Sequence, residues 1–305
     1  MSYLSRASVG AKLKPQMYVF VGLPKIGKTS LAAKFPAPLI LDIEDGSSHI
    51  RTTRLTNEDV ETWTVEKLLN ELAAFRKGGH SYKTLVVDSL SAVQQLVTTK
   101  ILTENNITSL SDLPYGQGSD KLRTQCSAIV DELKRVKEAG YNVIIPAHIF
   151  IKSFTDPALN STYDRYTINA DQKVADYLMS QADNIFFCAY KIETGVDGKT
   201  KKTQAFGGED RVMYTEYRAG HVGGNRLNLP YELPMDYDAL IKAIETGKPK
   251  SASELKKQIE ELIKLGAEKV ESTRLNAAAA KAKEAGDDEA TLERIANKLK
   301  EIVAA

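Results

Sequence analysis

Short apolar runs alternate with longer amphipathic stretches over roughly the first 180 residues of the chain. The apolar runs lie at residues 17–22, 38–42, 84–88 and 141–147. Helical spacing of apolar positions between these runs predicts helices at about 28–35, 66–76, 90–104 and 119–138. This alternation is typical of a parallel sheet with crossover helices, so we expect an α/β fold with a mostly parallel central sheet.

The pattern changes after residue 183. Two strand-like runs, NIFFCAYKIE at 184–193 and RVMYTEY at 211–217, are separated by a Gly/Lys turn, GVDGKTKK. Two such runs joined by a turn predict antiparallel strands added to one edge of the sheet.

The last 53 residues, 253–305, contain no aromatic residue and are rich in Ala, Lys and Glu. Gly266 and Gly286 divide this segment into about three predicted helices. We therefore expect an N-terminal arm at 1–16, an α/β core at 17–247 and a helical tail at 248–305. The tail is either a solvated helical appendage or a module for docking a partner or contacting another subunit. The apolar positions with helical spacing in the tail are Leu255, Ile259, Leu262, Leu292, Ile295, Leu299 and Ile302.

Composition restricts the class of protein without identifying it. The chain has 305 residues, of which 42% are hydrophobic and 27% charged, enough for one large α/β core and a small appendage. Its net charge of +1 argues against a uniformly basic surface for nucleic acid, so any such contact must come from local patches. Two cysteines indicate neither a disulfide framework nor a zinc site. We find no membrane-spanning run and no signal-peptide pattern, and expect a cytoplasmic protein.

The first apolar run leads directly into GLPKIGKT, which fits the P-loop pattern GxxxxGK[ST]. Backbone N–H groups of such a loop cradle phosphates, Lys28 can reach the β and γ phosphates, and the Thr29 hydroxyl can ligate Mg²⁺. ATP and Mg²⁺ are therefore the expected cofactors. The predicted nucleotide-binding residues are Gly22, Leu23, Pro24, Lys25, Ile26, Gly27, Lys28, Thr29 and Ser30.

Three later strands end in polar residues. Glu44 follows the run at 38–42, Asp88 ends the run at 84–88, and His148 follows the run at 141–147. Ligands bind at the carboxyl edge of open parallel sheets, so we interpret Asp88 as the acid that holds Mg²⁺ and Glu44 as the base that polarises water. His148 would sense the γ phosphate. The alternatives are a solvated strand-end carboxylate for Glu44 and a structurally satisfied histidine for His148.

This order of motifs resembles the RecA core family. That family has a P-loop, an acid-bearing turn similar to LDIEDG, a strand similar to VVDS and a strand ending in a polar switch residue. The chain is most similar to phage-encoded RecA-like ATPases of the Sak type, which act in single-strand annealing and recombination. That similarity lies in PAPLILDIEDG, YGQG at 115–118, PAHIF and YTEYRAGHVGGNRLNLPYEL, and it covers about residues 14 to 245.

The resemblance implies a homo-oligomer, ring or filament, with the γ phosphate at a subunit interface. The chain departs from the family pattern at two points. His148 stands where RecA recombinases carry Gln, and Gly224 and Arg226 stand where the bacterial recombinase places two lysines that reach a neighbour's ATP. Arg226 is thus the predicted arginine acting in trans, with Arg218 as its competitor. A surface arginine without catalytic role is the alternative reading.

Two segments are predicted to be loops that contact DNA, at about 107–123 and 150–173. Aromatic rings interleaved with cations can stack on unpaired bases without reading sequence. The family resemblance also implies that loops at these places bind single strands, although aromatic residues in loops can simply be packed. The predicted DNA-binding residues are Tyr115, Lys152, Phe154, Tyr163, Arg165, Tyr166 and Lys173.

The sequence thus predicts a DNA-dependent ATPase that binds single-stranded DNA as an oligomer and promotes annealing or recombination, with a single-strand binding protein as a further candidate partner. The alternative is a P-loop module that binds ATP structurally or serves a replication or helicase assembly. A GTPase is a third option, but the chain has no NKxD-like guanine-reading element, and Asp88-Ser-Leu-Ser does not supply DxxG.

Overall fold

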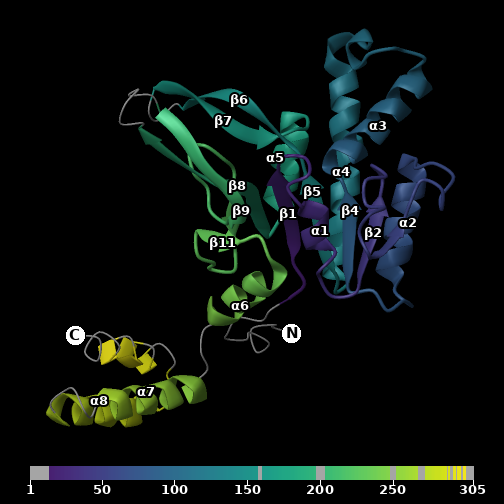
Figure 1. Ribbon diagram of the computed structural model, residues 1–305. Helices are drawn as coiled ribbons and strands as arrows, with labels where there is room; N and C mark the ends of the chain where they lie inside the picture. The colour runs from purple at the N-terminus through teal and green to yellow at the C-terminus, as the bar shows by residue number, and fades with distance from the viewer. Residues whose placement is uncertain are drawn as a thin grey trace. The chain divides into compact units, whose positions relative to one another are not determined.

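The computed structural model describes residues 14–156, 160–196, 203–247, 252–266, 272–286, 288, 291–292, 294–296 and 298–299. The chain divides between Gly247 and Lys248 into two compact units. The larger unit carries the P-loop and an α/β sheet (Figure 1).

The central sheet of the larger unit has the strand order β11-β9-β8-β1-β5-β4-β2-β3, and β10 pairs with β8. The strands β8, β1, β5, β4, β2 and β3 run parallel to their neighbours, whereas β9, β10 and β11 pair antiparallel at one edge. The predicted fold class is therefore confirmed. The bounds are β1 Met17–Gly22, β2 Pro38–Asp42, β3 Thr53–Leu55, β4 Thr84–Asp88, β5 Asn142–Ala147, β8 Asn184–Val196, β9 Thr203–Tyr214, β10 Gly224–Asn225 and β11 Glu232–Pro234.

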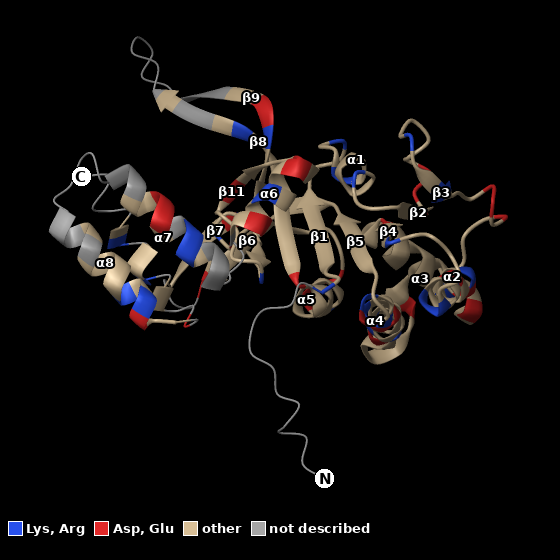
Figure 2. Cartoon of the chain, turned by 90° about the horizontal axis from the view of Figure 1, so that it is seen from below, with Lys and Arg blue, Asp and Glu red and all other residues tan. Residues whose placement is uncertain are grey.

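Helices cover both faces of this sheet. Figure 2 shows α2, α3, α4 and α5 on one face and α1 and α6 on the other. The four helices predicted between strands are present, and α5 and α6 were not predicted. The bounds are α1 Lys28–Ala32, α2 Val65–Lys77, α3 Leu90–Asn105, α4 Gln117–Glu138, α5 Gln172–Gln181 and α6 Tyr237–Gly247, with 3₁₀ turns η2 Leu110–Asp112 and η3 Pro114–Gly116.

The alternation of side chains along β1 separates two apolar cores. Met17, Val19 and Val21 pack into the core under α2 to α5, and Tyr18 and Phe20 pack into the core under α1 and α6. All five residues are at most 4% exposed. A strand buried on both faces is a continuous apolar run, which explains why β1 reads as MYVFVG.

The segment predicted as a second DNA-contacting loop is instead a regular hairpin followed by a helix. Strands β6 (Ile149–Asp156) and β7 (Ser161–Ile168) pair antiparallel in a separate two-stranded sheet. The loop prediction for 150–173 was wrong because both hairpin faces carry polar and aromatic residues, so no period-2 apolar face marks the strands. Within the larger unit, the hairpin is joined to the segment after β9 where the Tyr166 N–H donates to the Gly220 carbonyl at 2.9 Å.

The smaller unit contains α7 (Ala252–Gly266) and α8 (Ser272–Glu284), and its described residues from 291 to 299 are helical as well. Its own apolar core contains Leu255, Ile259 and Leu275, together with Leu292 and Leu299, each at most 3% exposed. The predicted apolar position Ile302 lies outside the described residues. Among the helices that the structure describes, none is long and apolar enough to span a membrane.

Candidate nucleotide-binding site

The P-loop connects β1 to α1 and encloses the ammonium of Lys28. Gly27 has a φ of 107°, a conformation that favours glycine. The Lys28 Nζ donates to the carbonyls of Gly22 and Leu23, each at 2.9 Å, and lies 3.3 Å from the Nδ1 atom of His148. Burial lowers the pKa of Lys28, and the charges of Asp88 and Glu44 oppose that effect. The loop thus holds a buried cation at the end of β1.

Thr29 and Asp88 face each other at the position predicted for the metal. The Thr29 Oγ1 donates to the Asp88 Oδ2 at 2.7 Å. Burial raises the pKa of Asp88 to about 6, while the hydrogen bond from Thr29 opposes that rise. Mg²⁺ is commonly held through one or two such oxygens, with substrate phosphates and water completing its shell. The hydroxyl and the carboxylate fit Mg²⁺ in that role.

Glu44 lies in a tight turn built by Asp42. The Asp42 side chain is fully buried and accepts hydrogen bonds from the N–H groups of Gly46 and Ser47 at 3.0 and 2.9 Å and from the Ser47 hydroxyl. The N–H of Glu44 donates to the Asp88 carbonyl at 3.3 Å, which ties the turn to the end of β4. No role was predicted for Asp42, although Asp side chains commonly accept hydrogen bonds from nearby backbone N–H groups in turns.

His148 bridges Lys28 and Glu44. Its Nε2 atom lies 3.3 Å from the Glu44 carboxylate, and the Ser89 hydroxyl donates to the same carboxylate. Because Nδ1 can accept from Lys28 while Nε2–H donates to Glu44, one neutral tautomer satisfies both contacts. The hydrogen bond from His148 is the largest cause that lowers the pKa of Glu44. Glu44 is therefore ionised at neutral pH, as a base requires. Ser89, like Asp42, had no predicted role.

Arg211 also lies beside the P-loop and was not predicted. Its Nη1 donates to the Ile26 carbonyl at 3.2 Å. A Cβ atom added at Gly27 would lie only 2.8 Å from the same Nη1. Arg211 comes from β9, nearly two hundred residues away in sequence, so no local motif could have placed it there.

The two arginines predicted to act in trans lie away from the P-loop of their own chain. Arg226 forms an ion pair with Asp183 at 3.1 Å, and the Asp183 carboxylate also accepts from the N–H of Met17 at the amino end of β1. The P-loop follows the opposite end of that strand. Arg218 lies with its guanidinium 4.2 Å from the centre of the Tyr231 ring and pairs with Glu216 at 3.4 Å. Their action on a neighbour's nucleotide stays a prediction.

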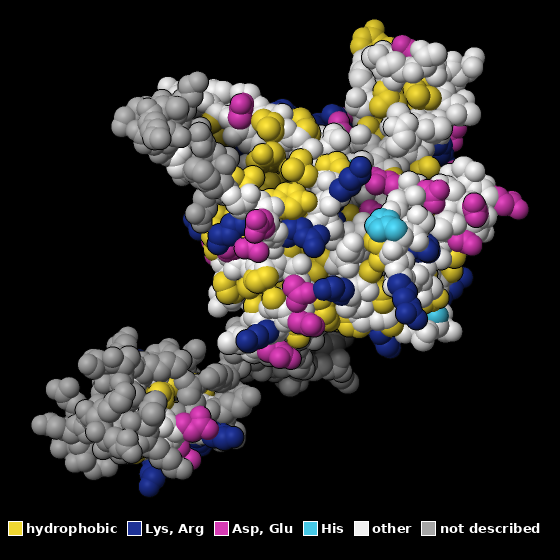
Figure 3. Space-filling view, in the orientation of Figure 1, with side chains coloured by type: hydrophobic (Ala, Val, Ile, Leu, Met, Phe, Trp, Pro, Cys, Tyr) yellow, Lys and Arg dark blue, Asp and Glu magenta, His cyan; other side chains and the backbone are white. Residues whose placement is uncertain are grey.

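Four of the predicted DNA-binding residues share one face of the β6–β7 hairpin. Lys152 pairs with Arg165 and Phe154 with Tyr163 in the ladder. The Arg165 guanidinium lies 5.0 Å from the centre of the Phe154 ring and 4.8 Å from that of Tyr217. Figure 3 shows hydrophobic side chains gathered beside the hairpin, with basic side chains at their border.

The other three predicted DNA-binding residues lie elsewhere. Tyr166 belongs to the opposite hairpin face, where its ring lies 5.4 Å from that of Phe187. Tyr115 is 98% exposed in η3, and Lys173 is in the first turn of α5. The structure therefore does not gather the seven residues into one surface.

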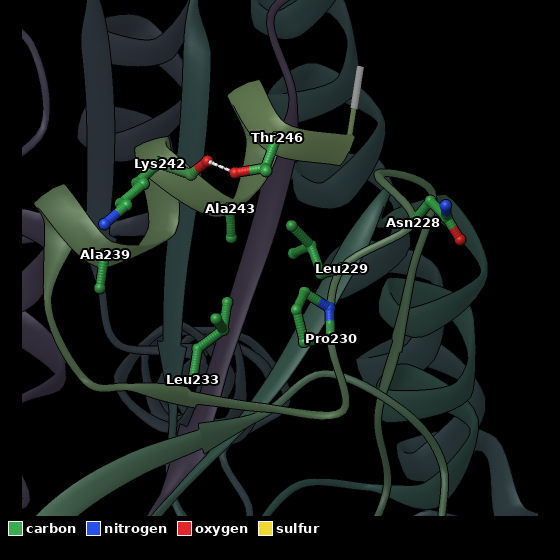
Figure 4. Close-up of a pocket in the computed structure, with 8 residues that line it drawn as sticks. All are labelled: Asn228, Leu229, Pro230, Leu233, Ala239, Lys242, Ala243 and Thr246. Carbon is green, nitrogen blue, oxygen red and sulfur yellow. Dashed lines mark hydrogen bonds between the residues drawn. The ribbon is translucent and has the colours of Figure 1, made fainter. Parts of the chain in front are cut away.

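A cavity of about 640 Å³ lies between α6 and the segment before β11 (Figure 4). Leu229, Leu233 and Ala243 contribute apolar side chains to it. None of its lining residues belongs to the P-loop or to the carboxylate and histidine cluster, so the nucleotide-binding site lies elsewhere.

Comparisons with known proteins give one family and several solved structures. A family model described as AAA domain, AAA_24, matches residues 14–227. A search of curated proteins gives no match. Similar solved structures include the flagellar accessory protein FlaH from Methanocaldococcus jannaschii, with 11% identity and a TM-score of 0.33 over 72% of this chain and 84% of that chain. A KaiC-like protein from Pyrococcus horikoshii OT3 has 11% identity and a TM-score of 0.38 over 72% and 85%.

Because the family model matches more than half of the chain, the protein belongs to the AAA_24 family. It is a P-loop ATPase of that family, and its P-loop and acidic strand ends suit ATP and Mg²⁺.

Proposed function

We propose that this protein is a Sak-type ATPase that hydrolyses ATP in the cytoplasm as a homo-oligomer and acts on single-stranded DNA during annealing or recombination. The observation that carries the ATPase part is the convergence of Lys28, Thr29, Asp88, Glu44 and His148 at one edge of the sheet. The resemblance of the YGQG and PAHIF segments to Sak-type proteins supports the DNA part.

In the proposed reaction, the P-loop N–H groups and Lys28 bind the triphosphate, while Thr29 and Asp88 would hold Mg²⁺. Bound there, Mg²⁺ would supply positive charge that stabilises the negative charge on the phosphates. Glu44 accepts a proton from the attacking water, and its low pKa keeps it ionised for that purpose. The hydrogen bond from Ser89 orients the carboxylate.

His148 is proposed to connect the phosphates to Glu44. The Lys28 ammonium uses all three of its donors on the two loop carbonyls and on His148. A γ phosphate that attracts Lys28 would free the Nδ1 atom of His148, while Nε2 still faces Glu44. The state of the phosphate would thereby alter the hydrogen bonding of the base.

The hairpin face is the proposed contact for single-stranded DNA. It combines the cations Lys152 and Arg165 with the rings of Phe154 and Tyr163. Such a face supplies both phosphate contacts and stacking platforms for unpaired bases. Stacking tolerates any base, which suits a protein that anneals strands of arbitrary sequence.

The decisive experiment measures steady ATP turnover with and without single-stranded DNA, with duplex DNA of the same sequence as control. We expect turnover to rise with the single strand, and the Glu44→Gln variant to show that the activity belongs to this protein. ATP binding without turnover under either condition would instead support the structural ATP-binding module. Turnover that ignores DNA would keep the ATPase and refute the DNA part.

A further inference from the structure

The P-loop and the polar strand ends account for the phosphates and Mg²⁺ in the proposed function. The nucleoside of ATP needs a separate contact surface. The groups that define the γ phosphate are all on one side of β1. His148 follows β5, Asp88 ends β4 and Glu44 follows β2, and the sheet order from β1 to these strands is β1-β5-β4-β2. A triphosphate that passes through the P-loop with its γ end at Glu44 must leave the loop on the other side of β1.

That other side is formed by β8 and β9. Gly22, the last residue of β1, pairs with Cys188 of β8, and β8 continues beyond that point to Val196. Tyr190 therefore lies about 7 Å beyond the end of β1, at two residues of strand rise. It pairs directly with Arg211 of β9. The Tyr190–Arg211 pair therefore lies next to the P-loop, beyond the carboxyl end of β1.

Both side chains of the pair point to the face of the sheet that bears α1. Directly opposed residues of an antiparallel pair share a face, and so do residues two apart along a strand. Cys188 and Met213, two positions from Tyr190 and Arg211, belong to the apolar core under α1 and α6. Arg211 confirms this direction, because it donates to the carbonyl of Ile26 in the loop itself.

The chemistry of this corner suits a nucleobase. Tyr190 is 40% exposed, and Arg211 is exposed with no carboxylate partner among the residues that the structure describes. The Met235 methyl lies 3.9 Å from the Cβ position of Gly27, and the N–H of Met235 donates to the Arg211 carbonyl at 2.9 Å. An aromatic ring, a planar cation and a thioether together offer stacking, cation–π and dispersion contacts to a flat heterocycle.

We infer that the nucleoside end of bound ATP lies against Tyr190 and Arg211, which recognise the face of the base in cis. This inference rests on the proposed function, since it places one half of the same nucleotide. Arg211 then has a role separate from that of an arginine acting across a subunit interface, and the β8–β9 ribbon becomes part of the nucleotide-binding site.

The test compares two ligands, Mg-ATP and inorganic Mg-tripolyphosphate, by calorimetric titration of the full chain. Tripolyphosphate has the phosphates without the nucleoside. Tyr190→Ala should weaken ATP binding about 5- to 150-fold, the range for loss of one aromatic–base stack, and should leave tripolyphosphate within twofold. Arg211→Met should weaken ATP about 2- to 30-fold with the same selectivity.

Three control variants separate the possible outcomes. Ile192→Ala, which truncates another exposed side chain of β8, and Lys77→Ala, which removes an exposed cation on α2, should bind both ligands as the parent does. Lys28→Ala should lose both ligands. Circular dichroism of each variant verifies its folding.

Unchanged ATP binding in Tyr190→Ala would overturn the inference. Equal losses of ATP and tripolyphosphate in Arg211→Met would place the guanidinium on the phosphates and overturn the nucleoside assignment as well. If the parent protein bound neither ligand, the proposed ATPase itself would fail, an outcome distinct from the two preceding ones.

Discussion

Lys28 and Glu44 share a hydrogen-bonded network through His148, and we propose that they serve different steps. Lys28 is buried among the loop carbonyls, whereas Glu44 is held by His148 and Ser89. Substitution at the two positions should therefore separate binding from chemistry.

We expect Lys28→Ala to abolish tight ATP binding, because it removes the charge that opposes the triphosphate. Glu44→Gln should bind ATP normally and lose about 10²- to 10⁴-fold in turnover, because only proton transfer is removed. Binding is measured by titration with a fluorescent nucleotide, and turnover by phosphate release. Hydrolysis at the parental rate in Glu44→Gln would show that Glu44 is only a strand-end acid.

The β6–β7 hairpin is the element with the clearest division between two faces. Phe154 lies on the face with Lys152 and Arg165, whereas Tyr166 lies on the other face against Phe187. A comparison of Phe154 with Tyr166 therefore tests which face contacts DNA.

Phe154→Ala should weaken binding of single-stranded DNA by about 1–3 kcal/mol, because one stacking platform is lost. Tyr166→Ala, the matched ring on the opposite face, should change the affinity less. Fluorescence anisotropy with a labelled oligonucleotide at fixed salt measures both, since phosphate contacts make the affinity salt-dependent. If Tyr166→Ala has the larger effect in folded protein, the DNA-contacting face is the other one.

The hairpin is also coupled to a stack of rings around His221. The His221 ring stacks on that of Phe187 with a centroid distance of 4.6 Å. The backbone of His221 forms isolated β-bridges with Tyr166 and Arg218. Burial is the main cause that lowers the pKa of His221, and the nearby charges of Arg165 and Arg218 lower it further, against a hydrogen bond to the Val222 carbonyl. The folded state thus favours the neutral ring.

A lowered pKa in the folded state means that the unfolded chain binds more protons below about pH 6.5. Stability from neutral His221 is fully present above that pH and is lost as the pH falls towards the folded-state pKa. We expect the drop in Tm between pH 7.5 and 5.5 to be smaller in His221→Phe than in the parent, with carboxylate titration common to both. An equal drop in the two proteins would contradict the assignment.

At the scale of the whole molecule, none of the hydrogen bonds that the structure describes joins an arginine to Lys28, Glu44 or His148. Arg226 lies near the amino end of β1, opposite the end that leads into the P-loop, and its side chain is 67% exposed. Its removal leaves Asp183 paired with Lys137 at 2.9 Å, so the fold should survive. This placement suits a residue that completes a neighbour's site.

Arg226→Ala alone and Glu44→Gln alone should both be slow, yet a mixture should recover part of the turnover. An Arg226→Ala subunit keeps an intact base, which a Glu44→Gln neighbour can complete with its own Arg226. Arginine fingers are worth about 10³ to 10⁵ in rate, so partial rescue is measurable. A co-assembled mixture no faster than the sum of its parts would exclude Arg226, and Arg218→Ala would then be tested in the same way.

Local sequence determined the P-loop, the buried strands and the acids that end them. Each of these is a short pattern whose meaning depends on neighbouring residues: glycines that permit a tight turn, apolar runs that suit a strand buried on both faces, and carboxylates at the functional edge of the sheet. Glu44, Asp88 and His148 could be predicted because parallel strands bring their carboxyl ends together.

Tertiary structure alone decided the contacts made across long separations. Arg211 reaches Ile26 from β9, Asp183 binds both Met17 and Arg226, and Arg165 lies between Phe154 and Tyr217. No periodicity or spacing encodes these contacts, because strand order and register set them and not neighbouring sequence. The sequence therefore specified the P-loop and the polar strand ends, and the pairing of β8 with β9 placed Arg211 beside them.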